Sequence, residues 1–231
     1  MPSAVTVLSP DYLVFADVDE TLINCKSMFD FLDHYLTGRY GDEGAGRAAG
    51  VRADLLGRAA RGVPRAATNR TYYRAFAGED AARVARWGET WFAERSAQDG
   101  FWIAPTARAL ARHVAAGAAL VLVSGSFPAL LDPVAQAVGA AHVVCTTPEV
   151  RDGILTGALA AAPVIGEGKR HAVRSLLARY PEVVTDDCFA YGDHASDLPM
   201  LAEVGHPVVV GEDPVLIAEL PRAGRLGAGD H

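Results

Sequence analysis

The chain has 231 residues, 50% of them hydrophobic, and a formal net charge of −7 at pH 7. A chain of this size and composition can bury one good core, or a core and a smaller lobe, without the help of disulfides. The negative net charge argues against non-specific nucleic-acid binding, which needs Lys and Arg to neutralise phosphates. We therefore expect small-molecule chemistry and no nucleic-acid partner.

The three cysteines, Cys25, Cys145 and Cys188, lie far apart and form no CxxC pair. This pattern predicts neither a disulfide framework nor a zinc site. The first residues lack the basic start and long apolar stretch of a signal peptide, and no apolar run is long enough to span a membrane. We expect a cytoplasmic protein with no membrane partner, and the sequence leaves the oligomeric state open.

The first predicted element is a buried strand over residues 12–16, and it ends in two acids, Asp17 and Asp19. In an open α/β sheet, ligands bind in the crevice beyond the carboxyl ends of the strands. Two carboxylates placed at that edge therefore indicate a catalytic site. A turn or helix cap, where Asp is also common, is the alternative.

Residues 23–99 follow as a helical segment, with apolar residues at helical spacing in 28–36 and 84–92 and no convincing strand. Residues 45–78 carry seven arginines against one acid. Most of these arginines are predicted to lie on a solvated helix face. Arg70 and Arg74, one turn apart beside two tyrosines, are candidates to face the site and attract anions.

Strands and helices alternate from about residue 105 onward. We predict helices over 106–116, 128–138, 169–180 and 197–204, and strands over 118–123, 142–145, 188–191 and 207–210. Residues 149–157 read as a β-hairpin turning at Asp152-Gly153, and the Gly-rich residues 222–231 as a frayed end. The expected fold is an α/β, Rossmann-like, doubly wound parallel sheet formed by 1–22 and 100–231, with 23–99 inserted as a helical cap.

Three further polar groups follow the later strands in order. Ser124 and Gly125 end the run at 118–123, Lys169 follows Gly168, and Asp193 and Asp197 follow the run at 188–191. Together with the two acids after the first strand, this set resembles the haloacid dehalogenase (HAD) superfamily of phosphohydrolases, in its phosphoserine-phosphatase-like branch. The four motifs appear in the order of that family and extend over the whole chain.

The resemblance implies a role for each catalytic residue. Asp17 is the expected nucleophile, because a carboxylate can attack phosphorus and divide one difficult step into two easier ones. Asp19 is the expected general acid to the leaving oxygen and then the base to water. Ser124, Gly125 and Lys169 are expected to bind the phosphoryl oxygens through a hydroxyl, a backbone N–H and a compact positive charge.

The acids brought to this edge of the sheet would repel each other and an anionic substrate unless a cation joined them. Oxygen ligands beside a phosphate favour Mg²⁺. The resemblance implies that Asp17, Asp193 and the backbone carbonyl of Asp19 bind the ion. Asp197 is expected to order the surroundings of the metal or of the lysine.

Lysine is rare in this chain, which has nineteen arginines but only Lys26 and Lys169. Lys26 lies nine residues after Asp17, where phosphoserine phosphatases typically carry a Glu that receives the amino group of the substrate. The reversed charge predicts that phosphoserine is a poor substrate, and that the true substrate offers Lys26 an acceptor. The alternative is a lysine that extends from the first cap helix into water.

The sequence thus predicts a Mg²⁺-dependent phosphatase that hydrolyses a small phosphorylated metabolite through an aspartyl-phosphate. A phosphotransferase with a hydroxyl acceptor and a non-catalytic binding protein of the same fold remain alternatives. A dehalogenase is a further rival, but it would need neither Asp19 as an acid nor the metal-binding acids. The substrate itself is not named, because specificity resides in the cap.

Overall fold

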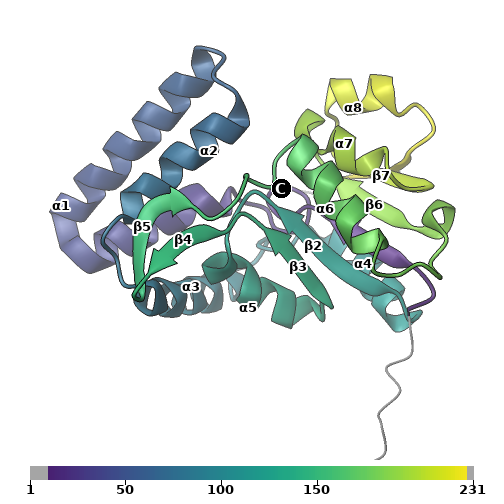
Figure 1. Cartoon of the computed structure of the whole chain (residues 1–231), viewed down its shortest axis with the longest axis horizontal. Coiled ribbons are helices and arrows are strands. Elements are labelled where there is room, and N and C mark those ends of the chain that lie inside the picture. The colour runs from purple at the N-terminus through teal and green to yellow at the C-terminus, as the bar shows by residue number, and fades with distance from the viewer. Residues whose placement is uncertain (1–9, 228–231) are drawn as a thin grey trace, which may run out of the picture.

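The computed structural model describes residues 10–227 and contains a six-stranded parallel sheet in the order β3-β2-β1-β6-β7-β8 (Figure 1). Its strands are β1 (Leu13–Ala16), β2 (Ala119–Ser124), β3 (His142–Cys145), β6 (Phe189–Gly192), β7 (His206–Val210) and β8 (Gly224–Leu226). The order runs outward from β1 to β3 and then restarts at β6 on the other side of β1. This reversal confirms the predicted doubly wound α/β fold, and it opens a ligand crevice beyond the ends of β1 and β6.

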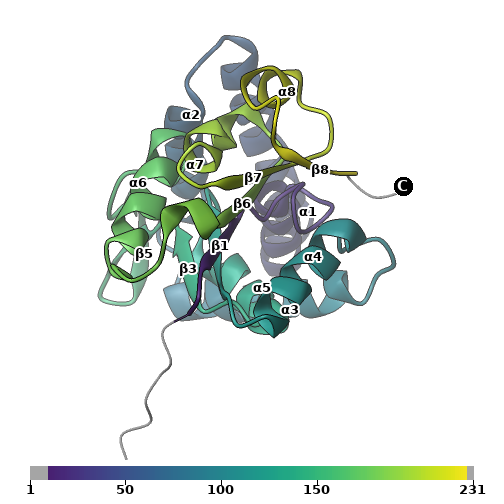
Figure 2. The same cartoon turned by 90° about the vertical axis from the view of Figure 1, so that its right-hand side faces the viewer.

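The strands are apolar on both faces, so helices must cover both. On β1, Val14 packs in one cluster with residues of α4 (Ala104–Ala115) and α5 (Pro128–Val138). Phe15 packs in the other cluster, with residues of α6 (Glu167–Leu177) and α7 (Leu198–Leu201). Figure 2 shows these two pairs of helices on opposite sides of the sheet.

The segment between β1 and α4 is helical, as predicted. It contains α1 (Ser27–Ala60), α2 (Arg65–Tyr73), the 3₁₀ turn η1 (Arg74–Phe76) and α3 (Ala81–Ser96). The far half of α1 and the start of α2 form an arm that rises away from the sheet (Figure 1). The division into a core of 1–22 and 100–231 and a cap of 23–99 stays a prediction, since α3 and the near half of α1 share one apolar cluster with the sheet.

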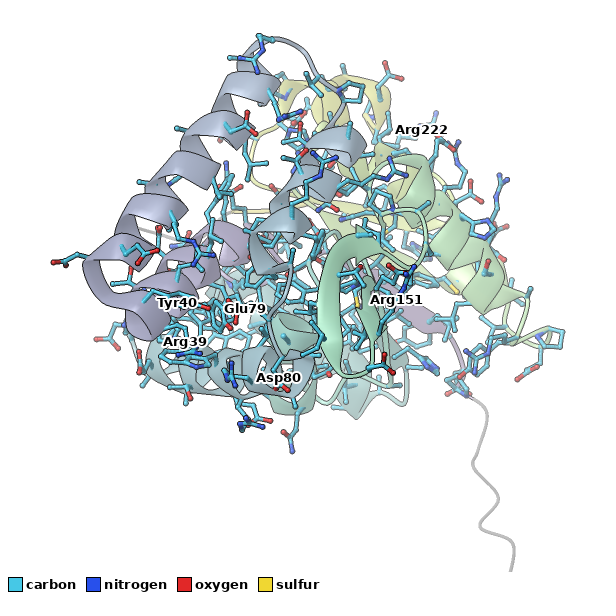
Figure 3. The ribbon with its side chains drawn as sticks, turned by 60° about the vertical axis from the view of Figure 1, so that its left-hand side comes forward. Arg39, Tyr40, Glu79, Asp80, Arg151 and Arg222 are labelled. Carbon is cyan, nitrogen blue, oxygen red and sulfur yellow. The ribbon has the colours of Figure 1, made fainter. Side chains whose placement is uncertain are left out.

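A kink at Gly41 divides α1, because this glycine has φ of 61° inside the helix. Glu79 anchors the helix just before the kink: it accepts hydrogen bonds from the hydroxyls of Tyr35 (2.6 Å) and Tyr40 (2.5 Å). Figure 3 shows Tyr40 beside Glu79 at the bend. The buried carboxylate thereby fixes the helical turn from which the arm leaves the core.

The predicted hairpin is present as β4 (Pro148–Arg151) and β5 (Ile154–Leu159). Asp152 and Gly153 both have positive φ, as a two-residue hairpin turn requires. The hairpin contacts the inserted segment, since the Leu155 N–H donates to the Glu79 carbonyl and its own carbonyl accepts from Gly78. The inserted helical segment therefore contacts a strand pair as well as helices.

The prediction of a frayed C-terminal segment is wrong for residues 224–226. These residues form β8, which pairs in parallel with β7, and α8 (Pro214–Glu219) connects the two strands. A Gly-Arg-Leu strand has too few apolar residues for periodicity to identify it. Residues 228–231 lie outside the described part.

Three predicted helices differ at their ends or in length, and the one predicted over 106–116 is α4, which begins two residues earlier and ends one residue earlier. The helix predicted over 169–180 begins two residues earlier and ends at Leu177, and the one over 197–204 is reduced to a 3₁₀ turn, η3 (Ala195–Asp197), followed by α7. Within residues 10–227, no helix is both long and apolar enough to cross a membrane.

Candidate active site

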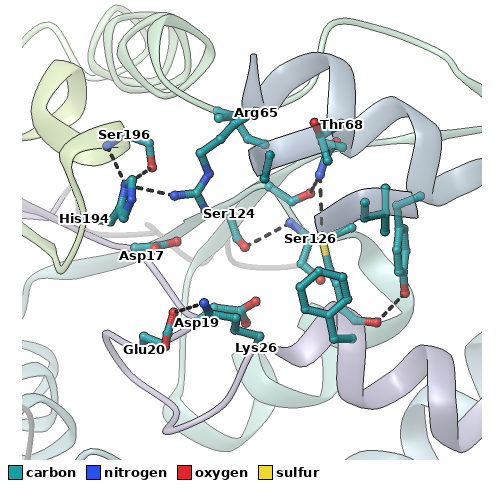
Figure 4. Close-up of a pocket in the computed structure, with 18 of the residues that line it drawn as sticks. Asp17, Asp19, Glu20, Lys26, Arg65, Thr68, Ser124, Ser126, His194 and Ser196 are labelled. Carbon is teal, nitrogen blue, oxygen red and sulfur yellow. Dashed lines mark hydrogen bonds and ion pairs between the residues drawn. The ribbon is translucent and has the colours of Figure 1, made fainter. Parts of the chain in front are cut away.

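The polar residues predicted from the strand ends do meet at one edge of the sheet. Asp17 directly follows β1, Ser124 ends β2 and Asp193 directly follows β6. β1 lies between the other two strands, and the Asp17 N–H donates to the Tyr191 carbonyl of β6 at 3.0 Å. The parallel register therefore delivers these side chains to one crevice, in which Figure 4 shows Asp17 and Ser124.

Lys169 is the centre of a buried ion-pair network. It lies in the first turn of α6, and its Nζ is 2.7 Å from Asp17 Oδ1 and 2.7 Å from Asp197 Oδ1. The lysine is 3% exposed and Asp197 is fully buried. Burial alone would lower the pKa of Lys169, but the two carboxylates raise it above its usual range, so the ammonium stays charged.

Asp197 uses both of its oxygens within the protein. Oδ1 accepts from Lys169, and Oδ2 accepts the backbone N–H groups of Asp193 and His194 at 3.2 Å each. A side chain at Gly192 would collide with Asp197, because a Cβ there would lie 2.7 Å from the Asp197 Cβ. Asp197 therefore orders both Lys169 and the loop that carries Asp193.

Asp17, Asp193 and Asp197 present oxygens within 4.8 Å of one another. Burial raises the pKa of Asp17 to about 7, against the lowering effect of Lys169 and with a further rise from Asp197 and Asp193. Burial also raises the pKa of Asp193 to about 6, although a 2.7 Å hydrogen bond from the Thr21 hydroxyl lowers it. Crowded buried carboxylates of this kind are suited to a divalent cation.

Asp19 points into the same crevice but takes no part in the lysine network. Its Oδ1 is buried and has no hydrogen-bond partner among residues 10–227. Burial raises the pKa of Asp19 to about 7, despite hydrogen bonds from Ser27 that lower it. A carboxyl group that is partly protonated near neutral pH can both donate and accept a proton.

The Ser124-Gly125-Ser126 loop lies between β2 and α5 and is fixed by the cap. The Gly125 carbonyl accepts from Asn69 Nδ2 (2.9 Å) and from the Tyr73 hydroxyl (3.1 Å), both on α2. The Ser126 N–H donates to Ser124 Oγ at 3.1 Å. Any side chain at Gly125 would meet Ile165 at 2.8 Å, so the glycine lets the loop and the chain before α6 approach closely.

A pocket of about 400 Å³ opens over these groups and extends between α1 and α2. Arg65, Thr68, Asn69 and Tyr72 line it at helical spacing. Arg70 and Arg74 are exposed and do not line the pocket, so the structure does not place them at the site. They are five and nine residues after Arg65, which is about half a turn away on the helix.

Arg65 is the cap arginine that faces the site, and it was not among the predicted site residues. Its guanidinium is 2.9 Å from His194 Nδ1. Lys26 also lines the pocket, but its side chain is 61% exposed and its Nζ is 3.5 Å from Glu20 Oε2. Figure 4 shows both pairs at the mouth of the pocket. Arg65 lies seven residues before Tyr72, which also lines the pocket, but that Tyr72 faces the pocket is itself seen only in the folded chain.

Fold and site together define a hydrolase-like α/β protein with an acidic centre under a helical cap. The haloacid dehalogenase-like hydrolase family matches residues 14–202. Phosphoserine phosphatase SerB1 of Mycobacterium tuberculosis is 32% identical over 204 residues, covering 86% of this chain and 64% of that protein. A probable phosphatase of the same organism is 42% identical over 112 residues, covering 48% of this chain and 38% of the relative. The chain thus spans less than two thirds of the length of these relatives.

Solved structures show the same fold. A protein of unknown function from Bordetella pertussis Tohama I has a TM-score of 0.82 at 26% identity, covering 95% of this chain and 99% of that one. A phospho-aspartyl intermediate analogue of phosphoserine phosphatase has a TM-score of 0.66 at 17% identity, covering 94% and 92% of the two chains. The chain belongs to the haloacid dehalogenase-like hydrolase family.

Proposed function

We propose that this protein hydrolyses a small phosphomonoester through an aspartyl-phosphate formed on Asp17, with Mg²⁺ as cofactor. The observation that carries the proposal is the network in which Lys169 joins Asp17 and Asp197 at 2.7 Å each, beside Asp193 and Ser124. Membership of the hydrolase family and the names of the two mycobacterial relatives support the same reaction.

Asp17 is the proposed nucleophile because Lys169 holds one of its carboxylate oxygens in place and the other oxygen is available to react. Its Oδ1 is 2.7 Å from Lys169, which leaves the second carboxylate oxygen available for phosphorus. The same lysine charge would attract the phosphoryl oxygens, together with the Ser124 hydroxyl and the Gly125 N–H. Fixed donors around the phosphoryl group lower the barrier because they need no rearrangement during the reaction.

Asp19 is the proposed proton donor to the leaving oxygen. It lies two residues beyond the nucleophile, lines the pocket, and its buried Oδ1 is unpartnered among the described residues. A proton on this carboxyl would pass to the departing alcohol, and the carboxylate left behind would then take a proton from the water that attacks the aspartyl-phosphate.

The acidic cluster fits a magnesium ion. Asp193 keeps one carboxylate oxygen that makes no hydrogen bond within the described residues, and Asp17 Oδ1, the oxygen that would not attack phosphorus, contacts only Lys169 there and keeps a lone pair, whereas Asp197 uses both oxygens. We therefore propose Asp17, Asp193 and the Asp19 carbonyl as ligands, with Asp197 acting through Lys169 and the loop. The ion would supply positive charge that offsets the repulsion between these acids and an anionic substrate.

The test is phosphate release from a panel of phosphorylated metabolites and p-nitrophenyl phosphate with Mg²⁺ present. We expect turnover that EDTA abolishes and added Mg²⁺ restores. Halide release from a haloacid that is insensitive to EDTA would instead support a dehalogenase. Transfer of phosphate to an added polyol at the expense of free phosphate would support a phosphotransferase, and no turnover of any ester would overturn the proposal.

A further inference from the structure

The cap side of the pocket is mostly apolar, and within residues 10–227 it carries no negative charge. Met28 and Phe29 line it from the start of α1, and further along the cap Leu55, Leu56, Ala59 and Val63 line it. The polar cap residues at the pocket, Thr68 and Asn69, are uncharged, and the charged ones, Lys26 and Arg65, are cations. Beyond Asp17, Asp19 and Asp193, Glu20 is the one carboxylate of the described residues that lines the pocket, and it pairs with Lys26.

This lining does not suit an amino-acid phosphate. The ammonium of such a substrate needs a carboxylate or several acceptors, since a charge left unpaired in a poorly hydrated pocket is unfavourable. The part of the cap that faces the pocket offers two cations, Lys26 and Arg65, and two neutral acceptors without a partner among the described residues, Thr68 Oγ1 and Asn69 Oδ1, but no carboxylate within residues 10–227. Because Lys26 already has Glu20 as a partner, this lysine requires no acceptor on the substrate.

Leu56 indicates which kind of ligand the pocket favours. It is a leucine that is 55% exposed, on the far half of α1, and it lies next to the buried Leu55 on the pocket wall. When the hydrocarbon portion of a ligand covers such apolar side chains, both surfaces leave water and the free energy of binding becomes more favourable. The volume of about 400 Å³ is within the range typical of small-molecule sites.

Building on the function proposed above, we infer that the substrate is a phosphate monoester of an apolar alcohol. Its phosphoryl group would lie at Asp17, Ser124 and Lys169, and its hydrocarbon portion would cover Leu55, Leu56 and the apolar start of α1. The reaction remains hydrolysis: the bond between phosphorus and the alcohol oxygen breaks, water adds to phosphorus, and the alcohol leaves with the proton from Asp19.

The test is kcat/KM for ethyl, butyl and hexyl phosphate, with phosphoserine alongside and Mg²⁺ present. The three alkyl alcohols are similarly basic, so the chemical step is matched and the series reports on the pocket. We expect kcat/KM to rise with chain length, by up to roughly fourfold for each methylene that is fully covered. Phosphoserine should be hydrolysed less efficiently than ethyl phosphate.

Leu56→Gln tests the position of the hydrocarbon, and Ile217→Gln is the matched control. Ile217 is 41% exposed on α8 and lies outside the site pocket. Leu56→Gln should reduce the ratio of hexyl to ethyl phosphate efficiency several-fold, whereas Ile217→Gln should preserve it. Both substitutions replace exposed residues, so thermal melts should show both variants folded.

The outcomes separate this inference from the proposed function. If p-nitrophenyl phosphate is hydrolysed but the alkyl series is flat, or phosphoserine exceeds hexyl phosphate, the apolar-alcohol inference fails and the phosphatase proposal stands. An equal reduction of the hexyl-to-ethyl ratio in both Gln variants would also overturn it. If no ester in either set is hydrolysed, both proposals fail together.

Discussion

The proposed reaction depends on the 2.7 Å ion pair between Asp17 and Lys169, which joins the end of β1 to the start of α6. This pair places the proposed nucleophile beside the positive charge that would attract the phosphoryl group. Asp17→Asn removes the oxygen that would attack phosphorus and keeps the size of the side chain. We expect a loss in kcat of roughly 10⁴-fold or more, in line with removal of other catalytic nucleophiles. Phosphate release measures it, with mass spectrometry to exclude deamidation. Retention of several per cent of the rate would contradict the assignment.

Asp19→Asn should affect esters according to how much their leaving group needs a proton. For ethyl phosphate, a loss of roughly 10²–10⁴-fold is expected, as for other general acids. For p-nitrophenyl phosphate the loss should be much smaller, because p-nitrophenolate leaves without protonation. Steady-state rates with the two esters give the comparison. Similar losses for both would show that Asp19 acts in some other way.

Lys26 provides a charge that can be removed without touching the acids of the site. Its Nζ is 3.5 Å from Glu20 at the pocket mouth, so Lys26→Ala removes a cation and frees a carboxylate. We expect kcat/KM for phosphoserine to rise about fivefold relative to ethyl phosphate, which corresponds to about 1 kcal/mol for two charges 4 Å apart in water. Lys26→Arg keeps the charge and is the control. An equal change for both esters would mean that the lysine only extends into solvent.

At the scale of elements, the helical phase of α2 decides which side chains reach the substrate. The clustering of arginines and tyrosines along the sequence favoured Arg70 and Arg74. In the structure, the hydrogen bonds from Asn69 and Tyr73 to the Gly125 carbonyl fix the rotation of α2 about its axis. That contact joins residues more than fifty positions apart. A long-range contact of this kind has no local sequence signal, so the facing arginine, Arg65, appears only in the folded chain.

The packing of α3 on α5 is a second element-scale feature, and it depends on Gly88. A Cβ there would collide with the Ala129 carbonyl oxygen, so the two helices approach through the glycine. Gly88→Ala should lower the free energy of unfolding by about 1–3 kcal/mol, the usual effect of overpacking. Urea denaturation gives this value.

Gly50→Ala is the control for that substitution. Gly50 lies in α1 with no atom within 4 Å of a new Cβ, and alanine there should stabilise the helix by about 0.5–1 kcal/mol. Destabilisation by Gly88→Ala together with stabilisation by Gly50→Ala would locate the effect in the contact between the helices. If both substitutions stabilise the protein, α3 and α5 do not pack this closely.

At the scale of the whole molecule, the sequence predicted the sheet because its strands are buried on both faces and read as continuous apolar runs, as in Val121 and Leu122. It also predicted the acids, since a parallel sheet brings strand ends to one edge. The strand β8 was missed because its three residues include only one apolar side chain, which is too few to show the alternation of apolar and polar residues typical of a strand. Thr21, whose hydroxyl donates a hydrogen bond to Asp193, was missed because, as for Arg65, its place at the site depends on a contact between residues far apart in the sequence.

The stability of the whole chain should respond to the charge crowded at its site. A carboxyl whose pKa is raised on folding, as for Asp17 and Asp193, destabilises the folded state when it ionises at neutral pH. A cation that binds only the folded protein reverses this effect. At a Mg²⁺ concentration about 100 times its Kd, the gain is about 2.7 kcal/mol, or roughly 5–10 °C in Tm for a chain of this size.

Asp193→Asn separates the two contributions in a thermal melt without any measurement of activity. Removing one of the crowded carboxylates should raise Tm in EDTA, because the remaining acids repel each other less. The same change removes a proposed ligand, so the increase in Tm caused by Mg²⁺ should largely disappear. Asp42→Asn is a control, because Asp42 is exposed on α1 and does not line the pocket. A Mg²⁺ shift in Asp193→Asn equal to that of the unmodified protein would show that the ion does not bind at this cluster.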